Sequence, residues 1–296
     1  MLWLIGNSGM LGSAVEKILL NEKLQYWATG READITDYRQ IERFSKNKEI
    51  AWVINCSGYT QVDKAEAEPE RAFQTNRNGV HNIAQFCLKK KCKLIHISTD
   101  YVFNGKKKLY EPYSEVDEPD PINIYGKSKL AGEGEIKKLL NDYFIIRTSW
   151  LYGSNYSNFV TTMLKLFKEK DTVQVVNDQW GSPTYTVDLA RVIIKIVKDN
   201  VRQYGVYHFA NEGAIAWYGF AQEIYEQAKR LGLIENKKEV KIVPVKTEEY
   251  KIAVAKRPKN SILSKEKIKQ TFNLGIRPWN EALGDYLNEF PFREKN

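Results

Sequence analysis

The chain of 296 residues opens with Leu2-Trp3-Leu4-Ile5 and continues as Gly6-Asn7-Ser8-Gly9-Met10-Leu11-Gly12. An apolar strand therefore leads directly into a turn whose glycines follow a G-x-x-G-x-x-G spacing, and apolar residues at helical spacing follow to about Asn21. Such a turn lets the backbone approach a pyrophosphate closely and places a helix N-terminus beside it. The stretch predicts a dinucleotide site built on these three glycines. A purely structural turn between strand and helix is the alternative.

Strands and helices alternate outward from this turn. Further strands are predicted over residues 24–29, 51–55, 93–97 and 143–147. Helical patterns lie between them, including one over residues 62–90 that breaks at Pro69 and one over residues 123–141. This alternation is typical of an α/β fold with a doubly wound, Rossmann-like parallel sheet and right-handed crossovers.

The second half alternates less regularly. Helices are predicted over residues 158–170, 188–198, 217–231, 264–272 and 278–290, strands over 173–176 and 205–209, and extended chain over 239–245 and 255–261. We therefore expect a Rossmann domain over residues 1–154. Residues 155–296 should form mainly a smaller substrate-binding lobe, interleaved with the first domain, with some segments returning to it.

One candidate for catalysis is the stretch Asn123-Ile124-Tyr125-Gly126-Lys127-Ser128-Lys129. Asn123 can cap a helix, and Tyr125 and Lys129 then share one face, a turn apart. An ammonium group at this distance favours the phenolate and lowers the tyrosine pKa from its usual value of about 10. The pair could therefore perform acid–base chemistry on a carbonyl group. An ordinary surface pair is the alternative.

Two strand ends offer further candidates. The strand over residues 93–97 continues as Ser98-Thr99-Asp100-Tyr101-Val102-Phe103, so Thr99 should lie at the sheet edge where open α/β folds bind ligands. A hydroxyl there can hydrogen-bond a carbonyl oxygen, although a turn-capping threonine is the alternative. Trp150 follows the strand over residues 143–147 and could cover a sugar or nicotinamide ring, or lie in the core.

Two further segments bear on the cofactor. Folds that prefer NAD usually carry an acid at the end of the second strand, whereas Arg31 stands near that position here. Arg31 could bind a 2′-phosphate, which favours NADPH over NADH and leaves both open, with a solvated arginine as the alternative. The small residues of Cys56-Ser57-Gly58-Tyr59-Thr60 follow the third strand and suit a loop lying against a flat ligand.

Composition narrows the possible partners. Hydrophobic residues make up 43% and charged residues 28%, as in ordinary soluble enzymes, and the apolar runs are too short to span a membrane. The net charge of +8 suits nucleic acid or a small anionic ligand, but no nucleic-acid motif accompanies it, so we expect the latter. The three cysteines and three histidines lack metal spacing, so we predict no metal. Unpaired cysteines fit a reducing cytoplasm.

In this order, the glycine turn, the Ser98–Phe103 strand end and Tyr125-x-x-x-Lys129 resemble the extended short-chain dehydrogenases/reductases. More narrowly, the chain resembles the dTDP-4-dehydrorhamnose reductase family. The narrower match rests on residues 34–37, Val62-Asp63-Lys64-Ala65-Glu66 with 68–70, 125–133, 147–153, 177–184 and Arg257-Pro258-Lys259-Asn260-Ser261.

The resemblance implies a reaction and a catalytic triad of Thr99, Tyr125 and Lys129. The 4-keto group of dTDP-4-dehydro-L-rhamnose would receive a hydride from NADPH or NADH and become the hydroxyl of dTDP-L-rhamnose. Tyr125 would give the proton, Thr99 would stabilise the oxygen, and Lys129 would bind the nicotinamide ribose and lower the tyrosine pKa. The implied substrate contacts are Thr99, Asp100, Tyr101 and Trp150.

The resemblance also implies cofactor contacts. These are Gly9, Met10 and Leu11 at the pyrophosphate, Asp34 and Ile35 on the adenine side, Ser57, Gly58 and Tyr59 at the far ribose, and, by looser analogy, Asn76 in a proton relay. Members of the family are often dimers, so a homodimer is possible here. Two other functions stay open: reduction of a different nucleotide-linked 4-keto-6-deoxysugar, and a non-catalytic regulatory subunit that binds NADP. The presence of the whole triad argues against a purely binding role.

Overall fold

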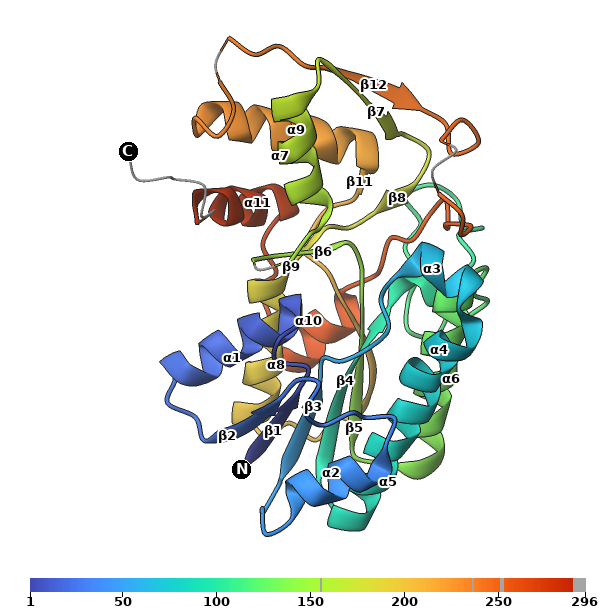
Figure 1. Cartoon of the computed structure of the whole chain (residues 1–296), viewed down its shortest axis with the longest axis vertical. Coiled ribbons are helices and arrows are strands. Elements are labelled where there is room, and N and C mark those ends of the chain that lie inside the picture. Colours follow the sequence, from blue (N-terminus) through green and yellow to red (C-terminus); the bar gives the residue numbers. More distant parts are fainter. Residues whose placement is uncertain (155, 236, 251–252, 290–296) are drawn as a thin grey trace.

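The computed structural model describes residues 1–154, 156–235, 237–250 and 253–289. A parallel sheet of six strands, in the order β10-β5-β4-β3-β1-β2, forms its centre (Figure 1). The strands are β1 (Leu2–Ile5), β2 (Tyr26–Thr29), β3 (Trp52–Asn55), β4 (Lys93–Thr99), β5 (Tyr143–Thr148) and β10 (Gly205–Phe209). The chain runs outward from β1 to β2 and then back through β3, so the predicted doubly wound sheet is confirmed. Its switch point lies between β1 and β3, where ligands bind in such folds.

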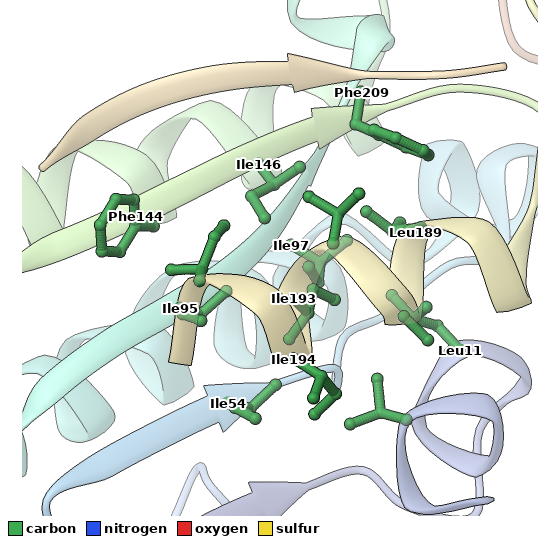
Figure 2. Close-up of a cluster of buried hydrophobic side chains, with 14 of the residues drawn as sticks. Leu11, Ile54, Ile95, Ile97, Phe144, Ile146, Leu189, Ile193, Ile194 and Phe209 are labelled. Atoms are coloured by element: carbon green, nitrogen blue, oxygen red, sulfur yellow. The ribbon is translucent and has the colours of Figure 1, made fainter. Parts of the chain in front are cut away.

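Helices cover both faces of the sheet because alternate residues of each strand point to opposite sides. Leu2 and Leu4 pack with α1 (Met10–Asn21), α8 (Thr186–Lys198) and α10 (Glu266–Phe272). Trp3 and Ile5 pack with α2 (Tyr38–Ser45), α5 (Val80–Lys90) and α6 (Ile124–Leu139) on the other face. Figure 2 shows the first of these cores, in which side chains of α1 and α8 meet those of β3, β4 and β5.

The helical region predicted over residues 62–90 is divided into four pieces. They are α3 (Val62–Ala67), α4 (Pro69–Phe73), the π-helical turn η1 (Gln74–Gly79) and α5. The break at Pro69 is confirmed, since proline lacks the amide that would continue α3. The π-helical turn was not predicted, and such turns often mark functional sites.

The second half has a core of its own. It contains α7 (Phe159–Glu169), α9 (Trp217–Arg230) and α11 (Trp279–Asn288). This part of the chain also has three two-stranded sheets. They pair β6 (Leu151–Tyr152) with β9 (Thr184–Tyr185), β7 (Thr172–Val176) with β12 (Lys241–Val245), and β8 (Trp180–Gly181) with β11 (Ile215–Ala216). The strand predicted over residues 205–209 and the amphipathic helix after Asp188 return to the large sheet as β10 and α8.

The segment predicted as extended over residues 255–261 forms no strand and makes one isolated bridge, at Asn260. Phe290, the predicted end of the last helix, lies outside the described residues. The domain boundary at residue 154 stays a prediction. Within the described ranges, no helix is both long enough and apolar enough to cross a membrane.

Candidate active site

The glycine-rich turn connects β1 to α1 with very little space. Gly6 has a φ of +83°, a conformation that side chains disfavour. A Cβ on Gly12 would lie 2.0 Å from the Gly6 carbonyl oxygen, so any side chain there would push α1 off the turn. Gly9 is the N-cap of α1, and Leu11, two residues further on, is buried in the core. The turn therefore keeps the helix N-terminus and the backbone around Met10 clear of side chains, which is what a pyrophosphate site requires. The pyrophosphate contacts of these residues stay a prediction.

The turn after β2 carries both an arginine and an acid. Arg31 is exposed, and the Gly30 amide donates a hydrogen bond of 2.7 Å to the Glu32 carboxylate. A Cβ on Gly30 would lie 3.2 Å from Glu32 Oε2 and 3.1 Å from the Ser8 hydroxyl, so this carboxylate lies beside the glycine-rich turn. Sequence reasoning missed Glu32, although it is the first acid after the second strand. Arg31 would attract a 2′-phosphate, whereas Glu32 would repel it and accept from ribose hydroxyls.

The two residues expected on the adenine side differ in accessibility. Asp34 is exposed and accepts hydrogen bonds from the Thr36 amide and hydroxyl, both at 2.9 Å. Ile35 is only 5% exposed, and its side chain packs so closely on Gly79 that a Cβ there would lie 2.7 Å away. The Ile35 side chain thus belongs to the core, and only its backbone is left for an adenine contact.

Asn76 holds the loop that follows β3. Its Oδ1 accepts from the Tyr59 amide at 2.8 Å, and its Nδ2 donates to the Tyr59 carbonyl and the Ser128 hydroxyl, both at 3.0 Å. Asn76 is fully buried within the π-helical turn. Because both ends of its amide are bonded to neighbours, this geometry favours a positioning role over the proton relay suggested by analogy.

The loop that follows β3 lies between the glycine turn and α6. A Cβ on Gly6 would lie 2.8 Å from the Ser57 amide nitrogen, and one on Gly58 would lie 3.6 Å from Lys129 Nζ. Ser57 itself donates to Asn55 Oδ1 through its amide and its hydroxyl, at 3.0 and 2.6 Å. The predicted cofactor residues of the turn, the loop and α6 therefore do lie together.

The N-terminus of α6 is capped from two sides. Asn123 Oδ1 accepts from the Gly126 amide at 2.7 Å, as the sequence predicted for a cap. Glu66 Oε1 accepts from the Ile124 amide at 2.8 Å, which brings α3 against the start of the helix. These bonds satisfy helix amides that would otherwise lack partners and fix the first turn, which carries Tyr125.

Lys129 is 5% exposed and reaches from α6 to the end of β4. Its Nζ donates to the Ile97 carbonyl at 2.7 Å and lies 3.4 Å from His96 Nε2. Burial lowers the pKa of Lys129 to about 8, against the opposing influence of Glu133 and Cys56. The amine therefore titrates near physiological pH, as groups at active sites often do.

His96, one of the three histidines without metal spacing, is a neighbour of Lys129. Asn55 Nδ2 faces His96 Nδ1 at 3.0 Å, and Asn55 is held in that orientation because its Oδ1 accepts from Ser57. His96 Nδ1 must then accept, so the proton of the neutral ring is on Nε2, facing Lys129. Burial, followed by the charge of Lys129, lowers the pKa of His96 well below its usual value, which keeps the ring neutral.

The Tyr125 phenol is not acidified in the way the sequence predicted. Burial raises its pKa to about 12, a hydrogen bond with Thr99 partly offsets the rise, and the charge of Asp100 adds to it. The predicted lowering by Lys129 is wrong for this structure. Desolvation is the largest influence, and Lys129 Nζ is bonded to the Ile97 carbonyl at the end of β4.

Three predicted substrate residues continue from β4 into the short helix η2 (Asp100–Val102). Thr99 is 5% exposed, and its hydroxyl donates to Asp100 Oδ1 at 3.0 Å and accepts from the Tyr101 amide at 3.1 Å. Burial raises the pKa of Asp100 to about 7, and hydrogen bonds from Ser261 and Thr99 oppose the rise. The Tyr101 ring stands edge-on to that of Tyr125, with centroids 5.9 Å apart. The structure thus brings Thr99, Asp100 and Tyr101 together with Tyr125.

Trp150 has an unusual backbone and a partner that the sequence did not reveal. Its φ is +47°, which is uncommon for a large side chain. The indole stacks on that of Trp217, at the start of α9, with centroids 3.4 Å apart and an interplanar angle of 5°. A Cβ on Gly181 would lie 2.5 Å from the Trp150 ring. The ring is therefore held between the end of β5 and the second core, at the border of the two halves.

The parallel sheet carries a glycine-rich turn at its switch point and Thr99 at the carboxyl end of β4, and α6 places Tyr125 and Lys129 beside them. These features define a short-chain dehydrogenase/reductase of the extended type. Within this class, the chain belongs to the family described as RmlD substrate binding domain, whose model matches residues 1–292.

Named relatives cover nearly the whole chain. It is 38% identical over 292 residues to a dTDP-4-dehydrorhamnose reductase of Aggregatibacter actinomycetemcomitans, which covers 95% of this chain and 96% of the relative. It is 35% identical over 286 residues to a dTDP-4-keto-6-deoxy-D-glucose reductase of Streptomyces niveus, covering 95% and 94%. The crystal structure of dTDP-4-dehydrorhamnose reductase from Bacillus anthracis in complex with NADP superposes with a TM-score of 0.90, at 39% identity and with coverage of 98% and 99%.

Proposed function

We propose that this chain is an oxidoreductase that reduces the 4-keto group of dTDP-4-dehydro-L-rhamnose to give dTDP-L-rhamnose, with NADPH or NADH as the reductant. The observation that carries the proposal is the cluster of Thr99, Tyr125 and Lys129 beside the glycine-rich turn, in a chain whose near full-length relatives bear this activity in their names. The cofactor, when bound, supplies the hydride.

The residues at the site fit a dinucleotide. The turn from Gly6 to Gly12 has no room for side chains, which leaves its backbone for the pyrophosphate. Ser57 lies against this turn and Gly58 lies beside Lys129, which would bind the nicotinamide ribose. Arg31 and Glu32 at the far end would meet the adenosine ribose, where one favours NADPH and the other NADH.

The proton transfer follows from the state of Tyr125. With a pKa of about 12, its hydroxyl stays protonated at neutral pH. Tyr125 and Thr99 would both hydrogen-bond the substrate carbonyl oxygen, and these bonds strengthen as the oxygen gains negative charge. An alkoxide is a stronger base than a phenolate, so Tyr125 gives up its proton once hydride has reached C4. Lys129, whose Nζ donates to the Ile97 carbonyl, would hold the nicotinamide ribose and does not lower the pKa of Tyr125.

The substrate would lie between the two halves of the chain. Asp100 and Tyr101 offer polar groups to the sugar, and the stacked Trp150 and Trp217 offer an apolar wall from the side of the second core. We assign the nucleotide to the lobe over residues 155–296. A homodimer and action in the cytoplasm are part of the proposal and stay predictions.

An absorbance assay tests the proposed function. Purified protein is mixed with NADPH or NADH and with dTDP-4-dehydro-L-rhamnose made in situ, and the loss of absorbance at about 340 nm is followed while the product is identified. We expect oxidation of the cofactor with formation of dTDP-L-rhamnose. No oxidation, combined with tight cofactor binding in a parallel titration, would contradict the proposal and favour the non-catalytic regulatory role.

The same assay should also be run with a second substrate, because the chain is similar to the reductase from Streptomyces niveus. The same triad would reduce dTDP-4-keto-6-deoxy-D-glucose by the same chemistry. The ratio of kcat/KM for the two sugars decides between them, since specificity is a difference in transition-state binding.

A further inference from the structure

Two sequence motifs that lie far apart in the chain meet at the edge of the site. Arg257 Nη2 lies 2.6 Å from Asp63 Oδ2, and its Nη1 lies 3.1 Å from Asp63 Oδ1, across a separation of 194 residues. Asp63 also accepts from the Val254 and Ala255 amides, both at 2.9 Å. A bidentate pair of this kind fixes the plane of the guanidinium group.

The guanidinium held in this way interacts with Tyr101. Arg257 acts on Tyr101 through its charge and as a hydrogen-bond donor, and both effects oppose the rise in the Tyr101 pKa that burial causes. The Tyr101 ring is the one that stands edge-on to Tyr125, at an interplanar angle of 77°. A chain of contacts therefore runs from Asp63 through Arg257 and Tyr101 to the proposed proton donor.

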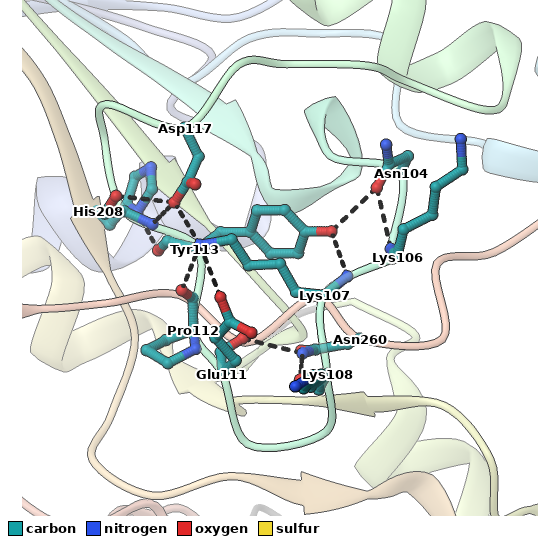
Figure 3. Close-up of polar contacts among 11 residues, drawn as sticks. Asn104, Lys106, Lys107, Lys108, Glu111, Pro112, Tyr113, Asp117, His208 and Asn260 are labelled. Carbon is teal, nitrogen blue, oxygen red and sulfur yellow. Dashed lines mark hydrogen bonds and ion pairs between the residues drawn. The ribbon is translucent and has the colours of Figure 1, made fainter.

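Residues 253–264, which we call the strap, continue from this contact along the site. Asn260 Nδ2 donates to the carbonyls of Lys108 and Glu111, at 2.7 and 2.9 Å, and so joins the strap to the loop over residues 104–117 (Figure 3). The Ser261 hydroxyl interacts with Asp100 and donates to the Trp180 carbonyl at 3.3 Å. The strap thus contacts two of the proposed substrate residues.

The strap is also joined to the catalytic helix. Asn123, the cap of α6, donates through its Nδ2 to the Lys256 carbonyl at 2.8 Å. Glu66, three residues after Asp63, accepts from the amide of Ile124 in the same first turn. One motif in α3 therefore binds both the start of α6 and Arg257.

We propose that Arg257, oriented by Asp63, is a positioning residue that holds Tyr101 against Tyr125 and so sets the place of the proton donor. This inference rests on the proposed function of Tyr125. Its physical basis is that a small misplacement of a reacting group lowers the rate steeply, even when the residue that moved is remote from the chemistry.

A double-mutant cycle in kcat tests the proposal, with Arg257→Met, Tyr101→Phe and the double variant. Arg257→Met should lower kcat by about 10- to 100-fold and leave the Kd for NADPH within about twofold. The double variant should be no slower than the slower single variant, because both changes break the same chain of contacts. Arg257→Lys should recover only part of the rate, since lysine cannot reproduce the bidentate pair.

Lys259→Met is the matched control. Lys259 lies in the same strap, but its side chain is 64% exposed and pairs at the surface with Asp178, at a distance of 3.7 Å. The kcat of Lys259→Met should stay close to that of the wild type. Independent losses in the Arg257 and Tyr101 variants that multiply in the double variant would overturn the proposal, and so would an unchanged kcat in Arg257→Met.

Hydrogen exchange provides a readout that does not depend on the reaction. Amides of residues 98–104 should exchange faster in Arg257→Met than in Lys259→Met if Arg257 holds this segment in place. Equal exchange in the two variants would overturn the positioning role. An inactive wild type with the expected exchange difference would instead refute only the proposed function.

Discussion

Tyr125 depends on its surroundings for its role, because a buried phenol stays protonated. The Tyr125→Phe variant removes only the hydroxyl and keeps the ring that packs against Tyr101. We expect turnover to fall by about 10²- to 10⁴-fold, the usual contribution of general acid–base catalysis. Cofactor affinity, measured by quenching of protein fluorescence, should survive. Near-normal turnover would refute the assignment of Tyr125 as proton donor.

Lys129 should give the enzyme a pH limit. Its amine, with a pKa of about 8, is charged below that pH and neutral above it. Because the proposed role needs the ammonium group, kcat/KM for the cofactor should fall as the pH rises through about 8. The pH dependence of kcat/KM is the correct measurement, since it reports the ionisation of groups in the free enzyme. Lys127→Met, on the exposed side of α6, should leave this fall in kcat/KM unchanged. A profile that stays flat up to pH 10 would contradict the role.

Cofactor preference should respond in opposite directions to two adjacent residues. Arg31→Ala should weaken NADPH more than NADH, whereas Glu32→Gln should strengthen NADPH because a repelling charge is removed. For exposed charges we expect changes of about two- to fivefold in Kd. Arg39→Ala, on the exposed face of α2, serves as the control. Equal changes for both cofactors would mean that Arg31 and Glu32 do not face the 2′ position.

At the scale of single elements, α6 is fixed by one close contact with η1. A Cβ on Gly132 would lie 2.1 Å from the Asn76 carbonyl oxygen, whereas one on Gly134 would meet nothing within 4 Å. Gly132→Ala should therefore destabilise the protein by about 1–3 kcal/mol, through the strain of overpacking. Gly134→Ala, in the same helix, should stabilise it by about 0.5–1 kcal/mol. Urea unfolding of the two variants measures both, and equal effects would contradict the role of this contact.

The elements that carry the site were predictable because each has a strong local pattern. The glycine turn, the Thr99 strand end and the helix capped by Asn123 follow from periodicity, capping and spacing. The π-helical turn around Asn76 was not predictable, since its extra residue is set by packing against α6 and leaves the apolar spacing almost unchanged. The predicted lowering of the Tyr125 pKa was wrong because this pKa depends on desolvation, which the spacing of residues does not reveal.

At the scale of the whole molecule, one buried ion pair joins three elements. Arg147 of β5 donates to the Glu133 carboxylate of α6 at 2.9 and 2.7 Å, and Ser98 at the end of β4 donates to the same carboxylate at 2.6 Å. Arg147→Met should destabilise the protein by about 3–5 kcal/mol, because buried Glu133 then keeps only the Ser98 hydroxyl and the partly exposed Lys137, 3.6 Å away, as partners. The double variant with Glu133→Gln should recover part of this loss. An unfolding free energy unchanged in Arg147→Met would mean that water reaches the carboxylate.

Contacts across the two halves were the part least accessible from sequence. The resemblance drew attention to the motifs of Asp63 and Arg257, yet nothing in their spacing showed that they touch. The stack of Trp150 on Trp217 likewise joins the end of β5 to the start of α9. Such contacts depend on how the lobe lies against the sheet, which local patterns do not specify.

The position of β10 has a consequence for synthesis of the protein. Five of the six strands of the sheet lie within the first 148 residues, but the edge of β5 is covered only by residues 205–209. A nascent chain thus exposes an unpaired β-edge until the ribosome has added these later residues, and such an edge is a template for aggregation. Arg257 arrives later still. Expression yield should therefore depend on chaperones that shield the growing chain during this interval.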